Sequence, residues 1–172
     1  MHDRLRVPRY CETCGLTLEA IEEHTIETLL PEKNTGRAYE VGDTIKLPGT
    51  AVAIARSGFR PGFREIDDLD DLWFVLLWRC QSPGCGADNG LSLHIRGSVL
   101  VAAESATLGR DALCRAHFLD QEIGNGEVQR VYRRVYPDED DDVVALMQLE
   151  WMLQDICAGR YDDGEGDATS TS

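Results

Sequence analysis

The chain of 172 residues contains little lysine, little proline and no long apolar run. Lysine occurs only at Lys33 and Lys46, so nearly all of the 17 basic residues are arginine. The 6 prolines and the 42% of hydrophobic residues argue against wholesale disorder and favour a globular protein. The longest strongly apolar run, residues 72–78, is far too short to span a bilayer, and residues 1–10 contain no signal-peptide core. We therefore expect no membrane partner and a reducing, cytoplasmic compartment, in which cysteines favour metal over disulfides.

The usual motifs of several enzyme classes are also missing. The sequence has no Gly-x4-Gly-Lys-Ser/Thr loop, no Gly-x-Gly-x-x-Gly turn, no His-Glu-x-x-His and no Gly-x-Ser-x-Gly. No His-x-Glu segment precedes a Pro-Cys-x-x-Cys, as a zinc deaminase would require. A ββα-metal nuclease would need a catalytic histidine on its hairpin, but His94 has the alternating neighbours of a surface residue on a half-exposed strand. We therefore expect a protein that is not an enzyme.

Cysteine and histidine, by contrast, occur in three close pairs. Each pair is spaced so that one loop or one helical turn could present both side chains to a single metal ion. Zn²⁺ takes four thiolate or imidazole ligands in a tetrahedron, and two such pairs usually make one structural site. All six residues are therefore candidate ligands of a structural zinc. In chain order, the first, second and third pairs are Cys11/Cys14, Cys80/Cys85 and Cys114/His117.

The first two pairs share the features of a zinc knuckle. Tyr10 precedes the first pair directly, Trp78 lies two residues before the second, and Gly15 and Gly86 follow the pairs at once. Glycine adopts positive φ without steric cost, which lets the chain turn so that backbone N–H groups point at the thiolates. These segments resemble the knuckles of zinc-ribbon and treble-clef zinc-finger proteins. The resemblance covers the knuckles alone and implies no specific family.

Chain order leaves three pairings open. The chain has the order of a treble clef: the second pair comes first, a hairpin follows, and the third pair lies on a helix. This pairing of the second and third pairs is our leading interpretation. The first alternative joins the first and second pairs as a zinc ribbon whose halves are separated by 65 residues, 15–79. The second alternative joins the first and third pairs.

The rest of the pattern predicts an α+β fold with small antiparallel sheets and a C-terminal helix. Residues 16–30 have apolar residues at helical spacing, although residues 25–28 could equally form a strand. Residues 38–55 predict an antiparallel meander, and residues 72–79 predict a buried strand that leads into the second pair. Residues 91–102 predict a hairpin that turns at Arg96-Gly97-Ser98.

The formal charge of −14 is concentrated near the C-terminus. Residues 137–172 hold 11 of the 31 acids and one of the 17 bases, a net charge of −10, which leaves −4 for residues 1–136. An acidic first turn predicts a helix over residues 138–158, with Cys157 as a buried core thiol. We expect one zinc-stabilised domain over residues 1–160 and a disordered acidic tail over residues 161–172, which lacks an apolar anchor.

Two arginine clusters contain interleaved aromatic residues, the combination used for phosphate contact and base stacking. The net negative charge of the whole chain opposes nucleic-acid binding, because it repels a polyanion at long range. Nucleic acid is therefore a possible partner but not the preferred one. The candidate nucleic-acid-binding residues are Arg56, Arg60, Arg64, Arg130, Arg133 and Arg134.

Taken together, these patterns predict a non-enzymatic zinc-binding protein with an interaction or regulatory role, which acts by binding another protein. Viral and phage-type proteins that block a host enzyme belong to this class. The alternatives are a nucleic-acid-binding zinc-ribbon protein and a structural component of a larger assembly. The zinc would perform no chemistry, because four protein ligands leave no coordination position for water.

Overall fold

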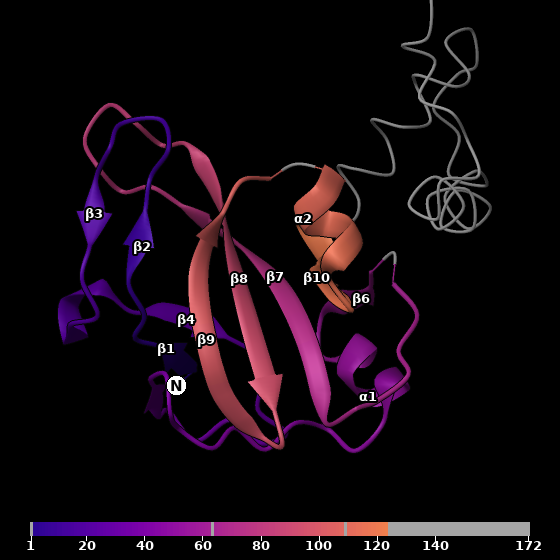
Figure 1. The fold of residues 1–172 in the computed structure, drawn as a ribbon. Coiled ribbons are helices and arrows are strands. Elements are labelled where there is room, and N and C mark those ends of the chain that lie inside the picture. The colour runs from indigo at the N-terminus through magenta and orange to yellow at the C-terminus, as the bar shows by residue number, and fades with distance from the viewer. Residues whose placement is uncertain (1, 63, 109, 124–172) are drawn as a thin grey trace, which may run out of the picture.

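The computed structural model in Figure 1 describes residues 2–62, 64–108 and 110–123. The fold is α+β, with three small sheets and few helices in this part of the chain. Its elements are β1 (Asp3–Leu5), β2 (Arg9–Tyr10), β3 (Thr17–Leu18), the 3₁₀-helix η1 (Glu22–His24), β4 (Ile26–Thr28), β5 (Ala38–Tyr39), α1 (Ala51–Arg56), β6 (Phe59–Pro61), β7 (Asp71–Arg79), β8 (Asp88–Arg96), β9 (Val99–Ala106), α2 (Arg110–Arg115) and β10 (Phe118–Asp120).

The largest sheet has five strands in the order β6-β10-β7-β8-β9. β8 runs antiparallel to both β7 and β9, and the three appear in Figure 1 as long curved strands that lie side by side. β10 pairs parallel to β7 and antiparallel to β6. The central strands carry much of the core, including Leu72, Phe74, Leu91 and Leu93, which are fully buried. The apolar run at residues 72–78 is therefore a buried central strand, as its composition predicts.

The β8–β9 hairpin also agrees with the sequence-based expectation. β8 ends at Arg96 and β9 begins at Val99, so Gly97 and Ser98 form a two-residue turn. Their φ angles are 54° and 64°, the left-handed values that a tight hairpin with the native strand twist requires.

Two smaller sheets lie in the N-terminal part of the chain. One has the order β4-β1-β5, and the other is the two-stranded β2-β3 pair that forms the first knuckle. The backbone N–H of Tyr10 donates to the hydroxyl of Ser105, 2.7 Å away, and so attaches β2 to β9. This contact brings the first knuckle to the edge of the large sheet.

The structure corrects three sequence-based expectations. Residues 16–30 are not a helix, because β4 pairs with β1 and only η1 turns helically between them. Residues 51–56 are the helix α1 instead of a strand, because the side chain of Thr50 caps it by accepting the N–H of Ala53 at 3.1 Å. The helix near the third cysteine/histidine pair ends at Arg115, so the pair lies at the end of that helix.

Several other expectations concern residues that the structure does not describe. They are the helix over 138–158 with Cys157, the arginines Arg130, Arg133 and Arg134, and the acidic tail over 161–172. The domain limits at residues 1–160 therefore stay a prediction. Among the helices of the described residues, none combines the length and the apolar character needed to cross a membrane.

Candidate metal centre

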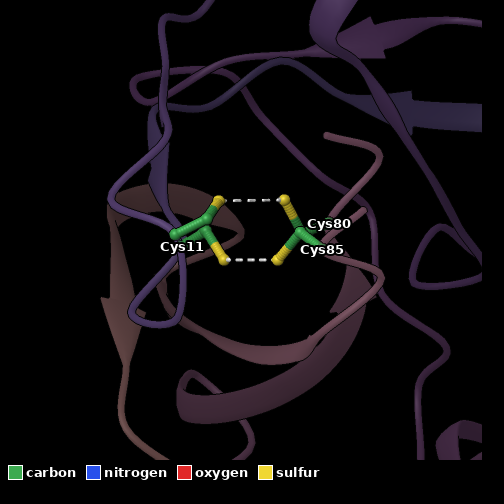
Figure 2. Close-up of side chains that lie close together, drawn as sticks. Cys11, Cys80 and Cys85 are labelled. Carbon is green, nitrogen blue, oxygen red and sulfur yellow. Dashed lines mark hydrogen bonds between the residues drawn. The ribbon is translucent and has the colours of Figure 1, made fainter. Parts of the chain in front are cut away.

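Two knuckles from distant parts of the chain face each other in the structure. Cys11 and Cys14 follow β2, whereas Cys80 and Cys85 lie in the loop between β7 and β8. Figure 2 shows Cys11 on one side of the site and Cys80 and Cys85 on the other. The four Sγ atoms all lie within 4.8 Å of one another, and among the described residues these four form the only such group of cysteine, histidine and acidic side chains.

The distances between the sulfur atoms fit a tetrahedral metal site. Sγ of Cys11 lies 3.7 Å from Sγ of Cys85, and Sγ of Cys14 lies 3.7 Å from Sγ of Cys80. A tetrahedron with zinc–sulfur bonds of about 2.3 Å has sulfur atoms about 3.8 Å apart. A disulfide would instead bring the two sulfurs to about 2.05 Å. These four thiols are free and stand at the spacing that one zinc ion requires.

Backbone hydrogen bonds hold both knuckles closed. The N–H of Cys11 donates to the carbonyl of Leu16 at 2.9 Å, and the N–H of Cys80 donates to the carbonyl of Ala87 at 2.8 Å. Gly15 and Gly86 have φ angles of 74° and 62°, so both glycines take the left-handed conformation that the knuckle motif implies. The local sequence therefore shapes each half of the site before the halves meet.

Asn89 connects the two knuckles directly. Its side-chain oxygen accepts the backbone N–H of Glu12 at 3.2 Å, and its side-chain nitrogen donates to the carbonyl of Ala87 at 2.9 Å. The side chain is 6% exposed, so these hydrogen bonds are shielded from water. The sequence analysis missed Asn89, because nothing in the local pattern distinguishes it from a turn residue.

The pKa values of Cys11, Cys80 and Cys85 shift in different directions. The backbone N–H groups of Cys14 and Thr13 point at Cys11 and lower its pKa to about 6, against a smaller opposing effect of burial. The N–H of Ser82 favours the thiolate of Cys80, but burial and the neighbouring thiols outweigh it and raise the pKa of Cys80 to about 12. The N–H of Ala87 favours the thiolate of Cys85, but burial and the thiols of Cys14 and Cys11 outweigh it and raise the pKa of Cys85. The thiolate of Cys11 forms readily, whereas a cation among the sulfurs would favour ionisation of Cys80 and Cys85.

The third pair lies elsewhere. Nδ1 of His117 accepts the backbone N–H of Trp73 at 2.9 Å, near the start of β7, whereas Cys80 follows the other end of that strand. Seven residues of strand separate these positions by about 23 Å. Neither Cys114 nor His117 belongs to the four-thiol group. The structure therefore has the split-ribbon pairing of Cys11/Cys14 with Cys80/Cys85 and lacks the treble-clef pairing, which was our leading interpretation.

Phe59, one of the aromatic residues interleaved with Arg56, Arg60 and Arg64, lies in the core. Arg56 ends α1, Arg60 lies in β6 and Arg64 lies in the following loop. Phe59 is only 6% exposed and packs edge-on against Phe74, with ring centroids 5.5 Å apart. Its ring is therefore a core side chain that is not available to a nucleic-acid base.

His94 is also more buried than its strand pattern predicts. Its side chain stacks on Trp73, with ring centroids 4.1 Å apart and planes 9° apart, and Nε2 hydrogen-bonds to Asp71. The residue is 9% exposed, so the prediction of a surface position is wrong. The side chain of Trp73 and the carboxylate of Asp71 supply the tertiary contacts that a strand pattern cannot reveal.

Comparison of the chain with protein-family models, with curated proteins and with solved structures finds no match. The candidate metal centre is therefore inferred from its geometry alone. Four free thiols lie within metal-binding distance of one another on two hydrogen-bonded knuckles.

Proposed function

We propose that this protein is a zinc-stabilised, non-enzymatic module that acts by binding another protein. The observation that carries the proposal is the group of four mutually close cysteine thiols, Cys11, Cys14, Cys80 and Cys85. A zinc ion held by all four has a complete coordination shell. It therefore stabilises the fold and has no open position at which to activate water.

Zinc suits this site better than other common metals. Four soft thiolates in a tetrahedron select zinc or iron, whereas magnesium, calcium and manganese prefer oxygen ligands. The ion would cross-link the β2–β3 hairpin to the loop between β7 and β8, near the hydrogen bonds that Asn89 and Ser105 make to the first knuckle. A structural metal is most useful at such a junction, because its binding free energy becomes folding free energy.

A protein partner is supported by the surface around Leu29. This side chain is 53% exposed and lies between two hollows with volumes of about 420 and 310 Å³. Gly58 lines both hollows, and Arg56 and Asp3 line the larger one. Leu29 lines both hollows, so a partner side chain placed in either one would gain an apolar contact. The charge of −14 and the buried Phe59 count against a nucleic-acid partner.

Metal analysis combined with native mass spectrometry tests the first part of this proposal. We expect the purified protein to retain one zinc ion per chain and to lose its cooperative thermal transition when a strong chelator removes the ion. A protein that contains no metal, or a zinc ion with a bound water in place of one cysteine, would contradict it.

In-cell cross-linking with mass spectrometry tests the second part, in the cells that naturally produce the protein. We expect cross-links from residues around Leu29 to one partner protein, and we expect Leu29→Glu to abolish them. Val41→Glu is the matched control, because Val41 is 50% exposed and lines neither hollow. Equal loss in both variants, or retention of a DNA duplex at physiological salt, would contradict a protein contact at Leu29.

A further inference from the structure

Arg9 is a buried arginine beside the metal centre. It is only 5% exposed, and its guanidinium carbon lies 5.2 Å from the centre of the Trp78 ring. Nε and Nη1 of Arg9 are buried without a hydrogen-bond partner, and so is Nε1 of Trp78. Within the described residues, no carboxylate lies in ion-pair contact with Arg9, although Arg4, Arg6, Arg37 and Arg79 each have one.

The positions of Arg9 and Trp78 are equivalent in the two knuckles. Arg9 stands two residues before Cys11, and Trp78 stands two residues before Cys80. In an extended chain, residues two apart point to the same face and their Cα atoms are about 7 Å apart. The burial pattern agrees, because Arg9, Cys11, Trp78 and Cys80 are all buried. The stacked pair therefore lies next to the first cysteine of each knuckle.

A buried cation without a counter-ion is strongly unfavourable, because water no longer solvates it. The guanidinium stays protonated in proteins, so Arg9 cannot avoid the cost by losing its proton. The stacking on Trp78 compensates a part of this cost. A nearby negative charge would offset the rest, and four thiolates around one zinc ion carry such a charge.

We propose that Arg9 is the counter-charge of the metal centre. Four thiolates and one Zn²⁺ carry a net charge of two minus, and a buried guanidinium two residues before Cys11 balances part of it. Trp78 holds the guanidinium in place. Arg9 thus acts as a positioning residue that balances the charge of the metal-bound cysteine group and so retains the metal. This inference rests on the proposed zinc site.

Arg79 provides a matched control. It is the direct neighbour of Cys80, yet its side chain is 71% exposed and pairs with Asp88 at 2.9 Å. Water and Asp88 already balance its charge, so replacing it should leave zinc binding nearly unchanged. A comparison of Arg9 with Arg79 therefore separates a buried counter-charge from a general effect of nearby positive charge.

The test is a zinc competition with a chromophoric chelator at about pH 7.5, applied to the wild type, Arg9→Met, Arg9→Lys and Arg79→Met. We expect Arg9→Met to weaken zinc binding by about 10- to 100-fold, the usual effect of losing an outer-shell partner. We expect Arg9→Lys to recover most of the affinity and Arg79→Met to stay within about twofold of the wild type. The spectrum of the cobalt-substituted variants checks that four thiolates still bind the metal.

The outcomes separate the two proposals. If the wild type holds no zinc, the proposed function fails. If the wild type binds zinc and Arg9→Met binds it equally well, only the role of Arg9 fails. The role of Arg9 also fails if Arg9→Lys loses as much affinity as Arg9→Met, because positive charge is then irrelevant. Should Arg9→Met not fold, Arg9→Gln replaces it in the same comparison, since both substitutions remove the charge and keep a long side chain.

Discussion

Trp73 and His117 are joined by two hydrogen bonds, one in each direction. The backbone N–H of Trp73 donates to Nδ1 of His117 at 2.9 Å, and the backbone N–H of His117 donates to the carbonyl of Trp73 at 2.9 Å. Nδ1 is therefore an acceptor, and a neutral ring carries its proton on Nε2. The pair attaches the segment before β10 to the large sheet, which explains why this histidine is part of the fold and not of the metal centre.

This arrangement predicts a pH dependence of stability. Burial lowers the pKa of His117 below its usual 6.5, and the charge of Arg64 acts in the same direction. The unfolded chain therefore takes up this proton first, so the contribution of His117 is present above about pH 6.5 and is lost as the pH falls through the lower folded-state pKa. We expect His117→Asn, which keeps an acceptor and does not titrate, to lose less thermal stability between about pH 7 and pH 5 than the wild type.

Calorimetry of both proteins at the two pH values measures this difference. Protonation of the cysteines affects both proteins alike, so it cancels in the comparison. Parallel losses of melting temperature in the two proteins would contradict the role assigned to His117.

Cys14 offers the clearest test of the metal site, because its side chain is exposed while Cys11 and Cys80 are buried. Cys14→Ser removes little packing, so its effect reports the loss of a metal ligand. We expect the variant to lose much of its zinc affinity and a large part of the folding free energy that the metal supplies, on the order of 10 kcal/mol in total for such sites.

Zinc content by elemental analysis and thermal unfolding measure this effect. Thr13→Ser is the control, since it changes an exposed residue of the same knuckle and keeps all four thiols. A Cys14→Ser protein with full zinc content and the melting temperature of Thr13→Ser would rule out Cys14 as a ligand.

Replacing the third pair separates the two leading pairings. We expect the double variant Cys114→Ala with His117→Ala to retain one zinc ion, because neither residue belongs to the four-thiol group. The protein is expected to be less stable, since Trp73 loses the acceptor of its N–H. Zinc content, measured on the folded fraction, is therefore the informative quantity. Loss of the ion together with retention of the fold would restore the treble-clef pairing.

Gly62 is expected to tolerate no side chain. A Cβ atom there would overlap the carbonyl oxygen of Ala116, since the N–H of Gly62 donates to the carbonyl of His117 at 2.8 Å and the two backbones are close. We expect Gly62→Ala to destabilise the fold by about 1–3 kcal/mol, the usual cost of overpacking. Gly49→Ala is the control, because a Cβ atom added at Gly49 would meet nothing within 4 Å. Chemical denaturation of both variants measures the difference, and equal stability would contradict the close approach at Gly62.

Local features of the fold followed from the sequence where a few neighbouring residues decide the conformation. Gly97 and Ser98 allow the tight β8–β9 turn, and the apolar run from Leu72 to Trp78 forms the central strand. Over residues 16–30 the helical spacing did not decide the conformation: β4 pairs with β1, which confirms the alternative of a strand over residues 25–28. Thr50 was missed as a helix cap, since the short apolar run after it suits a strand equally well.

The sequence by itself determined the chemistry of the metal centre, because each knuckle needs only a cysteine pair, its spacing and a following glycine. Which knuckles meet was decided by the tertiary structure. β10 pairs parallel to β7 and places His117 beside Trp73 at the start of that strand, whereas Cys80 follows its far end. The attachment of β2 to β9 brings Cys11 to the same end as Cys80. Strand length and strand order, which no local pattern contains, therefore decided which four cysteines come together.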